Sequence, residues 1–177
     1  LMASAGGGAM TAVLGFDRAE LEGLVNSQKG IVIANDNSSS QVVLSGTPEA
    51  VKKVTTQLNC KKAIPLQVSG AFHSPFMEEA SKSFALELDQ VSFNNASFPV
   101  LSNSEPSPIT DGMILKERLK NQMSSGVRWR ETMNVMVHNK INTIFEIGPG
   151  NVLSGLIKRS MKDVVVKQIF SESDVGN

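Results

Sequence analysis

The feature that most constrains the fold is a series of six short segments between residues 11 and 68, each with its own start or stop signal. Asp17 precedes a helical pattern and is a good N-cap. Thr47 and Pro48 give a second helix an N-cap and a first-turn proline. Around these helices lie apolar runs that are too short for helices and are bounded by turn residues, as is typical of strands. The predicted strands are 11–16, 31–34, 41–45 and 61–68, and the predicted helices are 17–26 and 47–58.

This β-α-β-β-α-β order is the ferredoxin-like arrangement, which we assign to a small lobe of residues 11–68. The stretch Asn35–Ser40 is predicted to be the turn between its second and third strands. Residues 69–177, together with 1–10, are predicted to form a second lobe, in which strands alternate with helices as in a mainly parallel sheet. Its predicted elements are helices 75–88, 114–121, 129–138 and 151–160, the last capped by Asn151, and strands 98–102, 142–147 and 164–169. The predicted fold class is therefore α/β.

Composition excludes several classes of function. Seventeen lysines and arginines balance seventeen acidic residues, so the chain lacks the basic field that drives general nucleic-acid binding. No apolar run approaches about 18 residues, so no segment is predicted to span a membrane. The single cysteine, Cys60, cannot form an internal disulfide. It is predicted to end a helix and to act as a packing thiol in a reducing compartment.

Two histidines are the first candidates for chemistry. His73 lies in a loop among small residues just before a helix, where an imidazole can serve as a general base or acid. The residue type alone favours a structural role for it. His138 is interpreted as a solvated or capping residue near a helix end. Because no cysteine, aspartate or second histidine lies at ligand spacing from His73, no metal site is predicted.

Other motifs have structural explanations that compete with functional ones. Gly148–Gly150 precedes a helix and could receive an anion, but it lacks the dinucleotide and Walker patterns, so a rigid turn is favoured. Lys61 and Lys62 either contact a phosphate or form a solvated strand end. No serine lies in a G-x-S-x-G setting, so a candidate base is present without a nucleophile. The residues alone predict an αβ domain of unknown role.

Four segments resemble the motifs of malonyl-CoA:acyl carrier protein transacylases. Val68–Met77 (VSGAFHSPFM) resembles the histidine motif, and Asn35–Gly46 (NDNSSSQVVLSG) resembles an asparagine-rich hairpin. Gln122–Trp129 (QMSSGVRW) resembles the glutamine segment, and Phe145–Arg159 (FEIGPGNVLSGLIKR) resembles the C-terminal signature. They occur in the family's order and spacing over nearly the whole chain. The resemblance implies a ferredoxin-like lobe joined to the C-terminal part of an α/β-hydrolase-like lobe.

The resemblance also implies a reaction. In that family a serine in a G-H-S-x-G turn takes malonyl from coenzyme A, and a histidine activates the serine and protonates the leaving thiolate. The acyl-enzyme then delivers malonate to the phosphopantetheine thiol of acyl carrier protein by a ping-pong route in fatty-acid synthesis. No cofactor or metal is implied. The implied catalytic residues are His73 and Gln122, whose main-chain carbonyl orients the imidazole, and the implied substrate-binding residues are Phe72 for malonyl selectivity, Asn35 and Asn37 near the thioester channel, and Lys61 and Lys62 near the coenzyme A phosphates.

The sequence departs from the family at its beginning. The serine motif, the arginine that pairs with malonyl and the oxyanion-hole residues have no counterpart in the 177 residues. The chain is therefore expected to be the C-terminal half to two-thirds of an acyltransferase, inactive alone. The partners expected for its intact parent are acyl carrier protein and a coenzyme A thioester.

The predicted location is the cytoplasm, or the plastid stroma in a plastid-bearing source. Two alternative functions stay open. One is an acyltransferase module of a polyketide synthase, which the short tail after Ile169 disfavours. The other is a non-catalytic module that binds carrier protein or a small molecule.

Overall fold

The computed structural model describes residues 7–68 and 70–174, which form two compact units, Leu1–Trp129 and Arg130–Asn177. Residues 1–6, predicted as part of the second lobe, and Ser69 of the histidine motif lie outside the described residues. In chain order the elements are β1 (Ala9–Phe16), α1 (Arg18–Ser27), β2 (Ile31–Ser38), β3 (Gln41–Gly46), α2 (Pro48–Gln57), β4 (Cys60–Pro65), a 3₁₀ turn (Pro75–Met77), α3 (Glu78–Asp89), α4 (Gly112–Asn121), α5 (Trp129–His138), β5 (Thr143–Ile147), α6 (Val152–Ser160), β6 (Val165–Ile169) and a second 3₁₀ turn (Glu172–Asp174).

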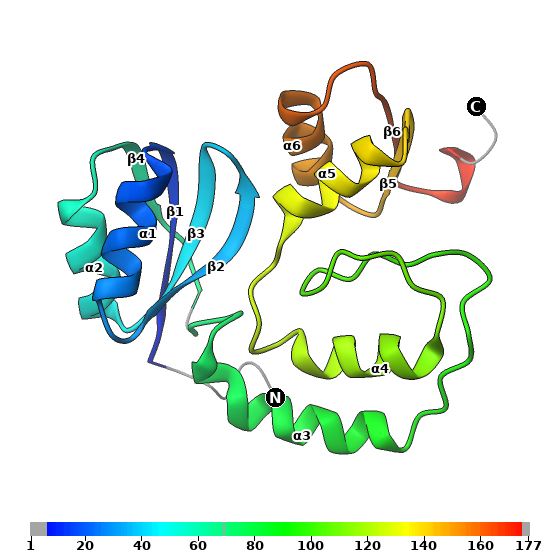
Figure 1. The fold of residues 1–177 in the computed structure, drawn as a ribbon, viewed down its shortest axis with the longest axis horizontal. Helices are drawn as coiled ribbons and strands as arrows, with labels where there is room; N and C mark the ends of the chain where they lie inside the picture. Colours follow the sequence, from blue (N-terminus) through cyan, green and yellow to red (C-terminus); the bar gives the residue numbers. More distant parts are fainter. Residues whose placement is uncertain (1–6, 69, 175–177) are drawn as a thin grey trace. The chain divides into compact units, whose positions relative to one another are not determined.

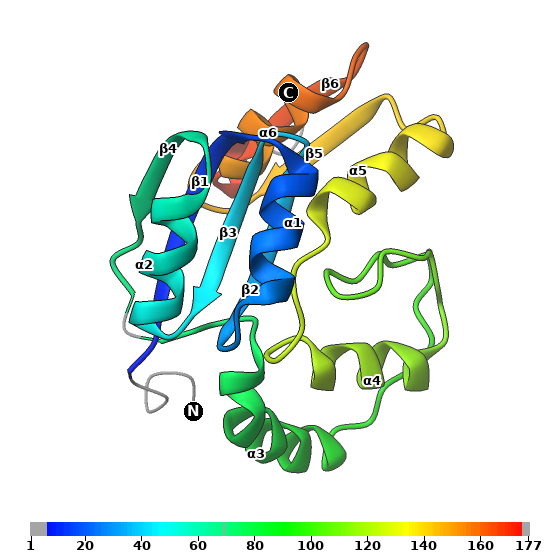
Figure 2. The ribbon, with the colours of Figure 1, turned by 60° about the vertical axis from the view of Figure 1, so that its left-hand side comes forward.

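The first four strands form one antiparallel sheet in the order β2-β3-β1-β4. Helices α1 and α2 lie side by side over one face of this sheet (Figures 1 and 2). Both predicted N-caps in this region are confirmed. The Asp17 side chain accepts from the N–H of Glu20 at 2.9 Å, and the Thr47 hydroxyl accepts from the N–H of Ala50 at 3.2 Å. The elements over residues 9–65 therefore follow the predicted β-α-β-β-α-β order.

The main core lies between this sheet and its two helices. Leu21 of α1 and Leu44 of β3 are both fully buried there. Withdrawing an apolar side chain of this size from water contributes about 1.5–3 kcal/mol. The residues of this core are Val13, Leu21, Val25, Ile31, Val42, Leu44, Ala50, Val51, Val54 and Leu58. The opposite face of the sheet, here called the open face, is lined by Met10, Ala12, Ala34 and Val43.

Helices α3 and α4 pack against each other in the rest of the first unit (Figure 1). The Nζ of Lys120 lies 2.8 Å from the Asp89 carboxylate, and this hydrogen-bonded ion pair lowers the pKa of Asp89 and raises the pKa of Lys120. The Ser81 hydroxyl donates to the Lys120 carbonyl at 2.8 Å. The predicted strand 98–102 is wrong, because only Val100 pairs, in an isolated antiparallel bridge to Ile109. A strand forms only where a neighbour supplies a ladder, and a single bridge is no ladder.

The second unit contains a parallel pair of strands, β5 and β6, connected through α6. The two described sheets therefore differ in type: the sheet of β1 to β4 is antiparallel, and the pair of β5 and β6 is parallel. The predicted side-chain cap by Asn151 is wrong, since this side chain makes no capping hydrogen bond. The Glu146 carboxylate instead accepts from the N–H of Leu153 at 3.1 Å and of Ser154 at 2.8 Å. Hydrogen bonding from Ser154, and from Leu153, lowers the pKa of Glu146.

Some predicted boundaries also need correction. Strand β2 continues through Ser38, so most of the predicted turn Asn35–Ser40 is strand, and two register shifts allow its residues to stay paired with β3. Cys60 does not end a helix; it is the first residue of β4, and its side chain packs against the main core. Strand β4 ends at Pro65 and not at residue 68. The helix predicted from residue 75 begins as the 3₁₀ turn Pro75–Met77 and becomes α-helical at residue 78.

Candidate functional site

His73 lies on the turn between β4 and α3 with a left-handed backbone. Its φ is 54°, a conformation that costs a residue with a side chain about 1–2 kcal/mol. The next residue, Ser74, is fully buried and fixes this turn. Its hydroxyl donates to the Ala71 carbonyl and accepts from the N–H of Phe76 at 3.3 Å. Because the hydrogen bond to Ala71 spans His73, it holds this backbone in the strained conformation, and the bond from Phe76 starts the 3₁₀ turn that follows.

The ring of His73 contacts the main chain of a distant segment. Its Nδ1 lies 3.1 Å from the carbonyl oxygen of Gln122, the residue that caps the C-terminus of α4. A carbonyl can only accept a hydrogen bond, so Nδ1 carries the proton and donates. In the neutral ring the lone pair is then on Nε2, which is the nitrogen able to take a proton from a reacting group.

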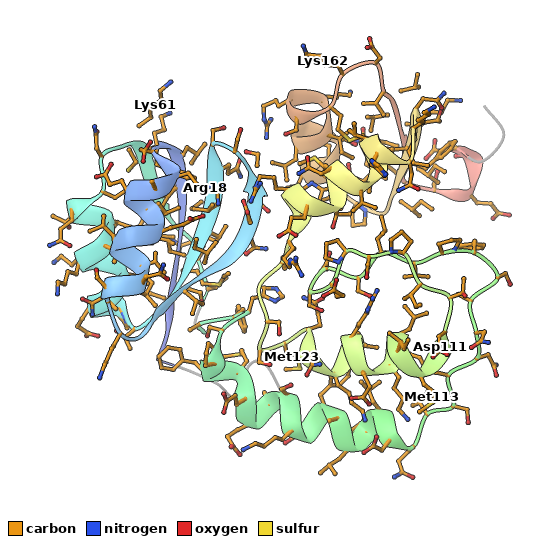
Figure 3. The ribbon with its side chains drawn as sticks, in the orientation of Figure 1. Arg18, Lys61, Asp111, Met113, Met123 and Lys162 are labelled. Carbon is orange, nitrogen blue, oxygen red and sulfur yellow. The ribbon has the colours of Figure 1, made fainter. Side chains whose placement is uncertain are left out.

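Apolar packing beside this hydrogen bond holds the same two segments together. Met77 and Met123 are buried in one cluster, and Phe72 packs against it. Phe72 also packs against the open-face residues of the small sheet. Phe72 and Met123 are the chain neighbours of His73 and Gln122, so the packed pair braces the hydrogen-bonded pair. Figure 3 labels Met123 at the start of the segment that follows α4.

The two asparagines of the predicted site lie on β2, where the register shifts. Asn35 pairs with Val43 of β3, and directly paired residues share a face, so Asn35 belongs to the open face. Asn37 lies in the second register shift of β2. The structure thus brings Asn35 onto the face against which Phe72 packs.

Lys61 and Lys62 lie on the edge strand β4 and point to opposite faces, as successive strand residues do. Lys62 pairs with Leu14 of β1, and the alternation along β1 places both on the open face. The methylenes of Lys61 lie against Gly15, and Figure 3 shows this side chain extending outward at the end of the sheet. The two lysines therefore do not form one basic surface, and only Lys62 shares a face with Phe72.

The remaining candidates have structural roles in the fold. Gly148 and Gly150 have φ values of 123° and 92°, which only glycine adopts readily, so this segment is a turn that requires them. His138 is the last residue of α5.

Within residues 7–68 and 70–174, no three His, Cys, Asp or Glu side chains are grouped as metal ligands would be. No helix in this described part is long and apolar enough to cross a membrane.

Comparison with protein families gives a match over almost the whole chain. The acyl transferase domain matches residues 1–176. The chain belongs to the acyl transferase domain family. A Synechocystis member named malonyl CoA-acyl carrier protein transacylase is 45% identical over 177 residues, which are 100% of this chain and 60% of that protein. A Bacillus subtilis member of the same name is 38% identical, over 92% of this chain and 54% of that protein.

Solved structures of acyl transferases agree with the fold. The crystal structure of Synechocystis malonyl-CoA:ACP transacylase matches with a TM-score of 0.94 and 46% identity, over 98% of this chain and 59% of that one. A malonyl-transacylase in complex with its type II polyketide synthase acyl-carrier protein matches with a TM-score of 0.85 and 29% identity, over 98% and 59%. The chain thus spans about 60% of the length of these relatives.

Two residues beside the site were missed in the sequence. Ser74 precedes a proline, and a Ser-Pro pair is a common helix-start signal, so its capping role could have been found. Gly126, by contrast, lies in a segment without periodicity, and its close approach to β2 gives no local signal.

Proposed function

We propose that these 177 residues are the histidine-bearing part of a malonyl-CoA:acyl carrier protein transacylase. The small sheet and its helices, which begin at Ala9 and not at the predicted residue 11, would be its ferredoxin-like lobe, and residues 69–177 would belong to an α/β-hydrolase-like lobe. The observation that carries the proposal is the hydrogen bond from His73 Nδ1 to the Gln122 carbonyl. This bond leaves Nε2 as a base, which is what the aspartate does for histidine in a Ser-His-Asp triad. Family membership and the names of the relatives support acyl transfer.

In the proposed reaction, Nε2 of His73 takes the hydroxyl proton of a serine, and the serine oxygen attacks the thioester carbonyl of malonyl-CoA. The tetrahedral intermediate collapses, the C–S bond breaks, and the imidazolium protonates the coenzyme A thiolate. Nε2 then takes the proton of the phosphopantetheine thiol, whose sulfur attacks the carbonyl carbon of the malonyl-serine ester. This second tetrahedral intermediate collapses, and the C–O bond to the serine oxygen breaks. The imidazolium finally returns a proton to the serine. Because no G-H-S-x-G motif occurs in the 177 residues, the mechanism requires a longer protein that supplies this serine.

The open face supports further assignments. Phe72, packed between the open face and the Met77–Met123 cluster, would set the size of the acyl group. Asn35 and Asn37 would lie along the thioester channel, and Lys62 would attract the coenzyme A phosphates. The reaction needs no cofactor, and its partners would be acyl carrier protein and a coenzyme A thioester. The protein would work in the cytoplasm or the plastid stroma.

The test uses malonyl-CoA labelled in the malonyl group. The 177-residue chain alone should take up no stable label, whereas a longer protein obtained by reading the gene upstream should take up label and pass it to acyl carrier protein. In that longer protein, His73→Ala should slow labelling roughly 10²- to 10⁴-fold, the usual contribution of a positioned acid or base. His138→Ala is the matched control and should label normally. Undiminished labelling of the His73 variant would contradict the proposal.

A polyketide-synthase acyltransferase is the second candidate. The structural relative in complex with a type II polyketide synthase carrier protein favours it. Comparing kcat/KM for transfer to a fatty-acid carrier protein and to a polyketide carrier protein separates the two. A non-catalytic binding module would instead bind carrier protein and transfer nothing.

A further inference from the structure

The segment that carries the Gln122 carbonyl is bound to the small sheet. The N–H of Val127 donates to the carbonyl of Ala34 at 2.7 Å, and the N–H of Asp36 donates to the carbonyl of Val127 at 2.8 Å. The residue between these two β2 positions, Asn35, forms with Val127 an isolated parallel bridge. Segment 122–128 thus pairs with the outer edge of the sheet through one residue, Val127.

The irregularity of β2 explains how this edge can accept it. β2 is one of the two edge strands of the sheet, and its register against β3 shifts between Ile33 and Asn35. A bulge leaves an extra residue outside the ladder and turns its neighbours' backbone groups in a new direction. The Ala34 carbonyl and the Asp36 N–H are the groups that bond to Val127.

Gly126 makes the close approach possible. A Cβ built at this residue would lie 2.9 Å from the carbonyl oxygen of Ile33, closer than real Cβ contacts, and the obstacle is backbone that cannot swing aside. Any side chain at this position therefore forces segment 122–128 and β2 apart.

A shift at Gly126 would be transmitted to the Gln122 carbonyl because the segment is short and tied at both ends. At its start, the N–H of Gln122 donates to the carbonyl of Leu119 at 3.2 Å. At its end, the N–H of Arg128 donates to the carbonyl of Asn103 at 2.8 Å. Between these ties the N–H of Ser125 donates to the carbonyl of Asn121 at 3.0 Å, which further restrains the backbone of the segment.

We propose that the bulged edge of β2 sets the direction of the Gln122 carbonyl toward His73, and that Gly126 is the positioning residue that allows it. The catalytic consequence rests on the proposed acyl transfer by His73. The positioning of the Gln122 carbonyl by Gly126 does not rest on the proposed function, because it concerns only which imidazole nitrogen of His73 holds the proton. The small sheet thereby acts on the imidazole through backbone hydrogen bonds.

The first test reads the tautomer of His73 by nitrogen NMR on the 177-residue chain, in which His138→Asn removes the only other imidazole. In the His138→Asn chain without further substitution, the neutral His73 ring should be in the Nδ1–H form, which is the minor form of a free histidine side chain. Gly126→Ala should move it toward the Nε2–H form. Gly23→Ala is the matched control, since a Cβ on Gly23 of α1 meets nothing within 4 Å, and it should change nothing. An unchanged tautomer in folded Gly126→Ala overturns the proposal.

Two further measurements keep the test decisive. If Gly126→Ala does not fold, hydrogen exchange is measured on the unsubstituted chain, where the amides of Val127 and Asp36 should exchange slowly. Exchange as fast as in exposed loops would show that segment 122–128 is not held against β2 and would overturn the proposal. In the longer enzyme, Gly126→Ala should lower kcat about 10-fold with KM nearly unchanged, since misplacing a group by 1 Å can cost about 100-fold. A tautomer shift in a protein without transfer activity would instead reject the proposed function and leave the positioning intact.

Discussion

Arg18 in α1 contacts two carboxylates in different settings, which allows a prediction with an internal control. Its guanidinium donates to both oxygens of Asp36, at 2.9 and 3.3 Å, and to the carbonyl of Ser38 at 3.0 Å. The same group lies 3.8 Å from Glu22, one helical turn further along α1. Replacing each carboxylate by alanine asks how much each ion pair stabilises the small sheet.

The two expected losses differ because burial and geometry differ. The Arg18 and Asp36 side chains are 27% and 15% exposed, and their contact is bidentate. Hydrogen bonds to charged groups contribute about 1.5–3 kcal/mol and exposed pairs about 0–1, so Asp36→Ala should cost about 1–2 kcal/mol. Glu22 is 52% exposed, and a helical pair of this kind contributes about 0.3–0.5 kcal/mol.

The free energy of unfolding should be measured where the sheet itself reports it. The chain forms two compact units, so a global signal can mix two transitions. Hydrogen exchange of the Val42 and Leu44 amides in β3 reads the small sheet alone. A double-mutant cycle with Arg18→Ala should return a coupling of about 1–2 kcal/mol for Asp36 and about 0.3–0.5 kcal/mol for Glu22.

Salt provides the outcome that would refute this reasoning. At about 1 M salt the Debye length is roughly 3 Å, so the Glu22 contribution should vanish while most of the Asp36 contribution remains. Equal losses for the two variants, or an Asp36 loss that also disappears in high salt, would mean that the bidentate pair is only a screened surface contact.

Three further predictions concern other parts of the chain. In the proposed longer transacylase, Lys62→Glu should raise the KM for malonyl-CoA at low salt and leave kcat nearly unchanged. Lys61→Glu, on the other face, should change neither constant, and equal effects of the two variants would contradict the assignment of faces. Gln122→Ala should change malonyl transfer little, because the contact uses its main-chain carbonyl, and a large loss in a folded variant would contradict that role. Hydrogen bonding lowers the pKa of Glu146 in the folded state, so the stabilisation of the fold by this carboxylate is fully present at neutral pH and is lost as the group is protonated in acid. The difference in free energy of unfolding between the unsubstituted protein and Glu146→Gln should therefore become smaller as the pH falls.

The small sheet could be predicted because its signals are local. Asp17 and Thr47 cap their helices as their residue types suggest, and period-two and period-3.6 patterns separate strands from helices. The run 98–102 looked like a strand for the same local reasons but lacks a neighbour that extends its single bridge into a ladder. Asn151 likewise has a good capping side chain, yet Glu146, five residues earlier in sequence, makes the capping hydrogen bonds.

The candidate site was only partly predictable for a related reason. His73 was a candidate because of its residue type and loop position, but the residue type alone favoured a structural role and left the imidazole without a partner. The partner is a main-chain carbonyl 49 positions away, and every residue has such a carbonyl. Lys61 and Lys62 are adjacent in sequence, but the alternation of side chains along β4 places them on opposite faces of the sheet, which only the strand assignment shows.

A histidine oriented by a backbone carbonyl requires other residues to hold that carbonyl in the right direction. A carboxylate partner can be supplied by one side chain, whereas a carbonyl points wherever its segment is held. The residues that decide this geometry are therefore those that shape the backbone. The buried hydroxyl of Ser74 binds the Ala71 carbonyl across the left-handed His73, and Gly126 lets its segment approach β2. Neither would touch the substrate through a reactive group. Substitutions at these two positions should therefore affect the imidazole more than substitution of the Gln122 side chain, although Gln122 is the residue in contact with it.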